Sequence, residues 1–164
     1  MKLRLLMNAD CNRSCKGCCN KDWDLQSLPV CKSFRDYSEI ILTGGEPMLH
    51  PDAVVEQVKV IRNQTSAPIY MYTAFRESAK KLMDVLSCLD GITVTLHTRK
   101  DTAPFEDLVK RIDATGLRFK SLRVNVFKGV STGLADLTHW SVQPNMIWVK
   151  DCPLPKDEVF MKVS

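Results

Sequence analysis

The alternation of apolar and polar positions along the chain predicts short β-strands separated by helices. Six apolar runs are bounded by turn residues and have the length and the β-branched or aromatic content of strands. The runs cover residues 2–8, 39–43, 68–73, 92–97, 122–127 and 146–150.

Between these runs, apolar side chains recur every three or four residues, which is the spacing of one face of a helix. Pro51 and Asp52 stand where the first helix is expected to begin. Gly91 and Gly116 stand where the second and third are expected to end. Residues 20–37 have no regular pattern and are expected to be irregular. The apolar sets are Val54, Val58 and Ile61; Leu82, Val85, Leu86 and Leu89; Phe105, Leu108, Val109 and Ile112; and, in a shorter and weaker pattern, Leu134, Leu137 and Trp140.

This alternation of strands and helices predicts an α/β fold with parallel strands joined by right-handed crossovers. The pattern fits an open doubly wound sheet or an incomplete barrel and does not choose between them. No Gly/Ser linker or low-complexity run divides residues 1–164, so we expect a single compact domain. In either fold, the functional loops follow the carboxyl ends of the strands.

Composition and charge exclude several classes of protein. Hydrophobic residues make up 45% of the chain and charged residues 26%, which is typical of a globular protein. The net charge of +4 is mild, and basic residues cluster only in pairs such as Lys80 and Lys81, so there is no specific nucleic-acid signal. No apolar stretch approaches the roughly 20 residues that span a bilayer. Residues 1–7 are too short for the apolar region of a secretory signal. We therefore expect a cytoplasmic protein that does not enter a membrane.

Cysteines are crowded near the amino terminus, where Cys11, Cys15 and Cys18 have the spacing C-x3-C-x2-C. In a chain without an export signal, such crowding favours metal binding over a disulfide framework. Three thiolates on one loop can bind three irons of a cubane cluster and leave the fourth iron open. A zinc site, completed by Cys19 or Cys31, fits the spacing as well.

A second motif, Gly44-Gly45-Glu46-Pro47, follows the second predicted strand. Its glycines allow the backbone to approach a ligand closely, and Glu46 offers a carboxylate to a cation such as an amino group. Alone, the motif would be read as a turn with an exposed glutamate. Because it and the cysteine loop both follow strands, both are expected at one edge of the sheet.

In motif and order, the cysteine loop and Gly44–Pro47 together resemble the radical S-adenosylmethionine (SAM) superfamily, and the resemblance covers nearly the whole chain. It implies a partial (βα)6 TIM-like barrel. It also implies a [4Fe-4S] cluster on Cys11, Cys15 and Cys18, whose fourth iron is chelated by SAM. Gly44, Gly45, Glu46 and Pro47 would contact the methionine amino group. The implied activity is reductive cleavage of SAM to a 5'-deoxyadenosyl radical that abstracts a substrate hydrogen.

Three further positions are cofactor-binding candidates by comparison with this superfamily. Thr73 ends the third predicted strand, where relatives contact the SAM ribose, although the Asn-Gly that often follows is missing. His97 ends the fourth strand and is as well explained as an exposed strand-end histidine. Asn125 shares a face of the fifth strand with Arg123 and is the preferred polar residue there. Trp148 could stack on adenine or belong to the core.

The substrate is left open by the sequence. Gly17 and the loop that follows are similar to the activases of glycyl-radical enzymes. The wide lateral opening of so small a barrel suggests a large substrate such as a protein or peptide, and a reductant such as flavodoxin or ferredoxin is an expected partner. A small-molecule enzyme similar to 7-carboxy-7-deazaguanine synthase is the alternative, and a non-catalytic metal-binding module is the competing class. Cys19 is expected to be an inert thiol and Cys88 to be structural.

Overall fold

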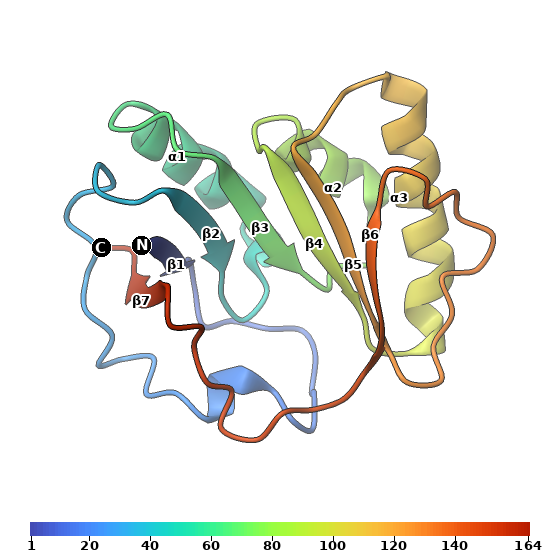
Figure 1. Ribbon diagram of the computed structural model, residues 1–164, viewed down its shortest axis with the longest axis horizontal. Coiled ribbons are helices and arrows are strands. Elements are labelled where there is room, and N and C mark those ends of the chain that lie inside the picture. Colours follow the sequence, from blue (N-terminus) through green and yellow to red (C-terminus); the bar gives the residue numbers. More distant parts are fainter.

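A computed structural model describes residues 1–164 and contains one sheet of seven parallel strands (Figure 1). The order across the sheet is β6-β5-β4-β3-β2-β1-β7, so the first six strands lie side by side in chain order and β7 adds to the free edge of β1. The strands are β1 Lys2–Leu6, β2 Glu39–Thr43, β3 Ile69–Thr73, β4 Gly91–Leu96, β5 Ser121–Phe127, β6 Ser141–Met146 and β7 Glu158–Lys162.

Three helices connect successive strands and cover one face of the sheet (Figure 1). Each begins or ends at a residue suited to the position: Pro51 is the first residue of α1, the Ser78 hydroxyl accepts from Lys81 N–H before α2, and Gly116 takes a left-handed conformation after α3. The helices are α1 Pro51–Arg62, α2 Ala79–Leu86 and α3 Thr102–Thr115, and three short 3-10 turns are η1 Cys19–Lys21, η2 Pro47–Leu49 and η3 Arg99–Asp101. No helix is long and apolar enough to cross a bilayer.

The two faces of the sheet differ in polarity because side chains alternate along each strand. The face toward the helices is almost wholly apolar and buried. The opposite face carries polar side chains such as Arg4, Tyr72 and Arg123 and holds no helix. The buried face consists of Leu3, Leu5, Ile40, Leu42, Ile69, Met71, Ile92, Val94, Leu96, Leu122, Val124 and Val126, with Thr73 at its edge.

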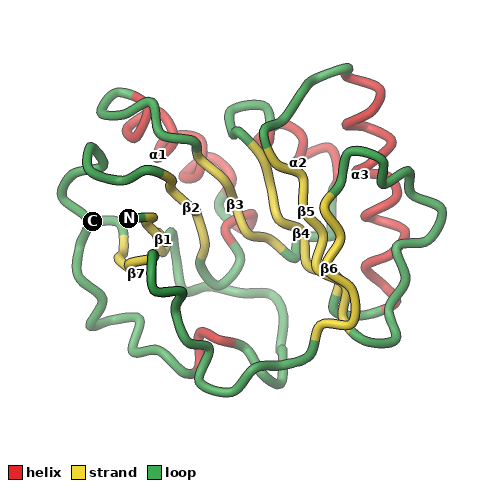
Figure 2. The backbone as a smooth tube through the Cα atoms, viewed as in Figure 1, coloured by secondary structure: helices red, strands yellow, loops and turns green.

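Two long irregular segments meet beyond the carboxyl ends of the strands (Figure 2). One runs from β1 to β2 and contains the cysteine loop. The other joins β6 to β7 and includes Trp148. They lie side by side, since a disulfide joins Cys19 in the first to Cys152 in the second. The prediction that 20–37 is irregular is confirmed apart from η1 and an isolated bridge from Val30 to Lys162.

The sequence-based prediction was wrong after β5. The sixth strand is Ser141–Met146 rather than 146–150, and β7 was not foreseen. Pro144 weakens the strand pattern, but β6 is an edge strand, where a missing N–H can be tolerated. The expected helix around Leu134 and Leu137 is absent: this stretch forms turns, with Leu134 exposed and Gly133 in a left-handed conformation. Trp140 is buried against Phe105 of α3.

Candidate functional site

A cavity of about 280 Å³ opens at the carboxyl ends of β1 to β4. It is lined by residues from the cysteine loop, from the turn after β2, from the end of β3 and from the end of β4. Among these are Cys11, Cys15, Cys18, Gly44, Gly45, Glu46, Thr73 and His97. The cavity therefore gathers most of the site residues predicted from sequence, although they are spread over much of the chain.

Two predicted residues do not line this cavity. Pro47 is buried as the first residue of η2, where its ring starts the turn that follows Glu46. Asn125 lies on β5 in register with Thr95 of β4 and is only partly buried. Thr95 lines the cavity, but Asn125 does not. A role for Asn125 in cofactor binding stays a prediction.

The glycines of the Gly44–Pro47 motif lie against the chain's own backbone. The N–H of Gly45 donates to the carbonyl of Asn8 at 2.9 Å, and that of Glu46 donates to the carbonyl of Asp10 at 2.7 Å. A side chain on Gly44 would come within 2.6 Å of the Asn8 carbonyl, and one on Gly45 would overlap the Asp10 carbonyl. These glycines therefore let the segment before Cys11 cross directly over the end of β2.

Glu46 is buried and its carboxylate is held by internal donors. Oε1 accepts from the Thr73 hydroxyl at 2.6 Å and from the Met48 N–H at 3.0 Å, while Oε2 accepts from the Ala74 N–H at 2.8 Å. Burial raises the pKa of Glu46, and these three hydrogen bonds oppose the rise. The carboxylate thus fastens the end of β2 to the end of β3, and Oε2, with one donor, keeps further acceptor capacity.

Arg13, inside the cysteine motif, anchors that loop to the start of α3. Its guanidinium donates to both oxygens of Asp101, at 3.0 and 2.8 Å, and to the Ala74 carbonyl at 2.5 Å. Asp101 is buried and also accepts from the N–H groups of His97 and Thr98. Burial alone would raise the pKa of Asp101, but the hydrogen bonds and charge of Arg13 outweigh it and lower the pKa.

Neither residue of this pair was predicted as functional. The sequence did hold one signal for Asp101: Thr98-Arg-Lys-Asp101 forms a capping box, in which each side chain binds the other's backbone N–H. No local sequence pattern indicated that Arg13 would pair with Asp101. Arg13 also affects the cysteine loop itself: burial raises the pKa of the Cys15 thiol, and the nearby guanidinium opposes that rise.

Aromatic rings close one side of the cavity. His97 stacks on Trp148 with ring centroids 5.2 Å apart and planes 10° apart, and Phe127 lies 4.8 Å from His97 and 4.5 Å from Trp148. Trp148 also packs beside Gly17, where an added Cβ would come within 2.6 Å of the tryptophan. Burial lowers the pKa of His97 to about 4, so the ring is neutral at pH 7. Glycine at 17 is what leaves room for Trp148.

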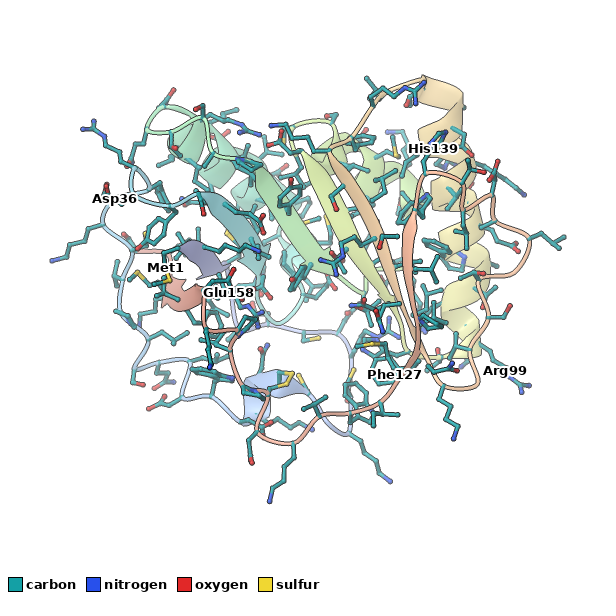
Figure 3. The ribbon with its side chains drawn as sticks, viewed as in Figure 1. Met1, Asp36, Arg99, Phe127, His139 and Glu158 are labelled. Atoms are coloured by element: carbon teal, nitrogen blue, oxygen red, sulfur yellow. A yellow bond between two sulfur atoms is a disulfide. The ribbon has the colours of Figure 1, made fainter.

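Cys19 is not the free, inert thiol that the sequence predicted. It forms a disulfide with Cys152, drawn as a yellow bond in Figure 3, which ties η1 to the segment that carries Trp148. Cys31 is buried elsewhere, with its thiol donating to the Ser33 carbonyl. Cys88 is partly buried on the helix side, as expected of a structural cysteine.

The three cavity cysteines are free thiols that line one cavity. The structure contains no group of three or more His, Cys, Asp or Glu side chains that could hold a metal ion. With Cys19 bonded to Cys152 and Cys31 in the core, neither completes a zinc tetrahedron.

Comparisons with models of protein families, with curated proteins and with solved structures gave no match for this chain. The cavity and the residues that form it therefore carry the functional conclusion.

Proposed function

We propose that this protein is a radical SAM enzyme whose cluster and SAM bind in the cavity at the carboxyl ends of β1 to β4. The observation that carries the proposal is that Cys11, Cys15 and Cys18 line the same cavity as Gly44, Gly45 and Glu46. The two motifs follow the neighbouring parallel strands β1 and β2, and their residues face one shared cavity. Cavities at this edge of parallel sheets are where such folds place ligands.

The sheet supports the finer proposal of a partial (βα)6 barrel. Six parallel strands follow one another in chain order, as in a barrel and unlike a doubly wound sheet, whose order reverses at a switch point. Helices cover one face, and polar side chains occupy the other, as expected if that face forms the inner wall. The seventh strand then extends the β1 edge of the barrel.

Cys11, Cys15 and Cys18 would hold the [4Fe-4S] cluster, and the turn after β2 would hold the amino-acid end of SAM. When bound and reduced, the cluster would supply the electron that cleaves the sulfonium C–S bond of SAM, giving methionine and a 5'-deoxyadenosyl radical that would take a hydrogen atom from the substrate to become 5'-deoxyadenosine. Glu46 keeps an acceptor position on Oε2, suited to an ammonium group. In the ionised form, the carboxylate of Glu46 would attract that ammonium strongly, since the local dielectric of a buried site is low.

The remaining residues of the cavity orient and protect the reacting groups. Arg13 fixes the cysteine loop to Asp101, and Thr73 fixes Glu46. His97 and Trp148 stack on each other and would form an aromatic wall beside the bound groups. Placement in the cytoplasm and reduction by a flavodoxin or ferredoxin remain predictions.

The test is anaerobic reconstitution of the full chain with iron and sulfide, followed by incubation with SAM and dithionite. We expect about four irons and four sulfides per chain and release of 5'-deoxyadenosine. Cys15→Ala should abolish both, whereas Cys88→Ala, which changes a cysteine outside the cavity, should preserve both. One zinc per chain, or a cluster without 5'-deoxyadenosine, would instead identify a non-catalytic metal-binding module.

A further inference from the structure

A second groove, of about 680 Å³, adjoins the cysteine cavity. It runs between the cysteine loop and the start of α3, and no acidic side chain lines it. Its lining is mainly polar and basic. The residues are Asn12, Arg13, Ser14, Cys15, Lys16, Arg76, His97, Thr98, Arg99, Lys100 and Trp148.

Three of the cations in this groove have no compensating charge. Arg13 and Arg76 are both paired with Asp101, which lies buried beneath them. Lys16, Arg99 and Lys100 are exposed, and none of them forms an ion pair. In Figure 3 the labelled Arg99 extends outward from the end of the molecule near Phe127. The fold therefore gathers an excess of positive charge from two loops that are far apart in the sequence.

The groove and the cysteine cavity share one boundary. Arg13, Cys15, His97 and Trp148 line both, so the stacked His97 and Trp148 rings belong to the shared boundary. A molecule anchored by its anionic end among the cations would have its other end at the rim of the cavity. The groove that would anchor the substrate thus adjoins the cavity where the reaction would occur, as required of a substrate subsite.

We propose that this groove is the substrate subsite and that it binds the phosphate end of a small phosphorylated molecule. The inference rests on the proposed function, since it names the substrate class of that site. Lysine and arginine are the common phosphate ligands of proteins. The groove has the size of a small-molecule site, and its polar lining suits a strongly hydrated anion rather than an apolar ligand.

A single-stranded nucleic acid fits these features less well. Such partners bind through bases stacked on free aromatic faces along an extended basic track. Trp148, the one large aromatic here besides His97, already stacks on His97 and packs beside Gly17. The cations also lie around one groove rather than along a track. Phosphate recognition without base stacking is what the geometry supports.

Calorimetric titration with inorganic pyrophosphate tests the proposal, using the full chain before and after anaerobic reconstitution. We expect binding that weakens as salt rises. Lys16→Ala combined with Lys100→Ala should weaken it by about tenfold or more, since charge-assisted contacts are lost. The matched control is Lys110→Ala combined with Lys156→Ala, two exposed lysines without ion pairs outside the groove, and it should bind like the parent chain.

Three results would overturn the proposal: no binding of pyrophosphate, equal weakening in the groove and control variants, or tighter binding of a short oligothymidylate than of pyrophosphate. The test is separate from that of the proposed function. Specific pyrophosphate binding without 5'-deoxyadenosine would sink the enzyme proposal and keep the groove as a phosphate site. Formation of 5'-deoxyadenosine without pyrophosphate binding would support the enzyme proposal and overturn the phosphate site in the groove.

Discussion

Arg13 and Asp101 form an ion pair across 88 residues of sequence, in which one guanidinium nitrogen, Nη2, lies 3.0 and 2.8 Å from the two carboxylate oxygens. The pair is nearly inaccessible to solvent: 11% of the Arg13 side chain and 3% of the Asp101 side chain are exposed. It joins the loop that carries the cavity cysteines to the amino-terminal end of α3. The shape of the cysteine loop therefore depends on a residue in a different part of the fold.

Asp101→Asn should destabilise the protein by about 3 kcal/mol, because it leaves the buried Arg13 charge without its partner. Urea unfolding measures this loss. Asp107→Asn is the matched control, since Asp107 pairs with Arg111 on the exposed surface of α3 at 3.0 Å. That variant should lose no more than about 0.5 kcal/mol. Equal losses in the two variants would show that the buried pair does not anchor the loop.

The same pair predicts how stability changes in acid. The pKa of Asp101 is lower in the folded chain than in the unfolded chain, so the unfolded state takes up the proton first as the pH falls. The stabilisation is fully present above the unfolded value of about 3.9 and is lost as the pH falls through the folded pKa. Free energies of unfolding measured between neutral pH and pH 3 should fall less steeply in Asp101→Asn than in the parent chain.

Glu46→Gln should cost about 2 kcal/mol, because its new NH2 group must face a backbone or hydroxyl donor. Either the Ala74 N–H or the Thr73 hydroxyl and Met48 N–H then lose their acceptor. Thermal unfolding at pH 7 provides the measurement. The exposed Glu56, paired with Lys59 on α1, gives the control variant Glu56→Gln, which should stay within about 0.5 kcal/mol of the parent.

Gly45→Ala should destabilise the chain by about 3 kcal/mol or more, because the new methyl group overlaps the backbone of Asp10 and forces the start of the cysteine loop to move. Gly129→Ala is the control, because Gly129 has a positive φ of 82° but open space around it. Alanine there suffers only the backbone strain of the left-handed conformation, without a steric overlap. That variant should lose only about 1–2 kcal/mol. Chemical denaturation measures both losses. If Gly129→Ala lost more stability than Gly45→Ala, the close approach of Gly45 to the Asp10 backbone would not explain the glycines of the Gly44–Pro47 motif.

Removing the Cys19–Cys152 disulfide by Cys152→Ser should lower stability by about 2–4 kcal/mol, since the unfolded chain gains freedom over a separation of 133 residues. Adding dithiothreitol should lower the free energy of unfolding of the parent chain by a similar amount. The reductant should leave the stability of Cys152→Ser unchanged. Cys88→Ser keeps the disulfide and should still respond to the reductant. A parent chain indifferent to dithiothreitol would contradict a stabilising role for the bond.

The sequence by itself determined the local elements and the two motifs. Period-two and period-3.6 patterns depend only on neighbouring residues, so 39–43 and the amphipathic helices α1 to α3 could be predicted. The pattern failed where local signals were weak: Pro144 masked β6, and Leu134 and Leu137 shared a helical spacing without forming a helix. Cys11, Cys15, Cys18 and Gly44–Pro47 could be recognised because each motif is contiguous.

Only the tertiary structure decided which distant groups meet. The pairing of Arg13 with Asp101, the stacking of Trp148 on His97 and the bond from Cys19 to Cys152 all join segments that no local pattern relates. The groove cations Lys16, Arg99 and Lys100 are unremarkable in sequence because charge accumulates through space rather than along the chain. Chain order of the strands brings their carboxyl ends to one edge, and that shared edge turns separate motifs into a site.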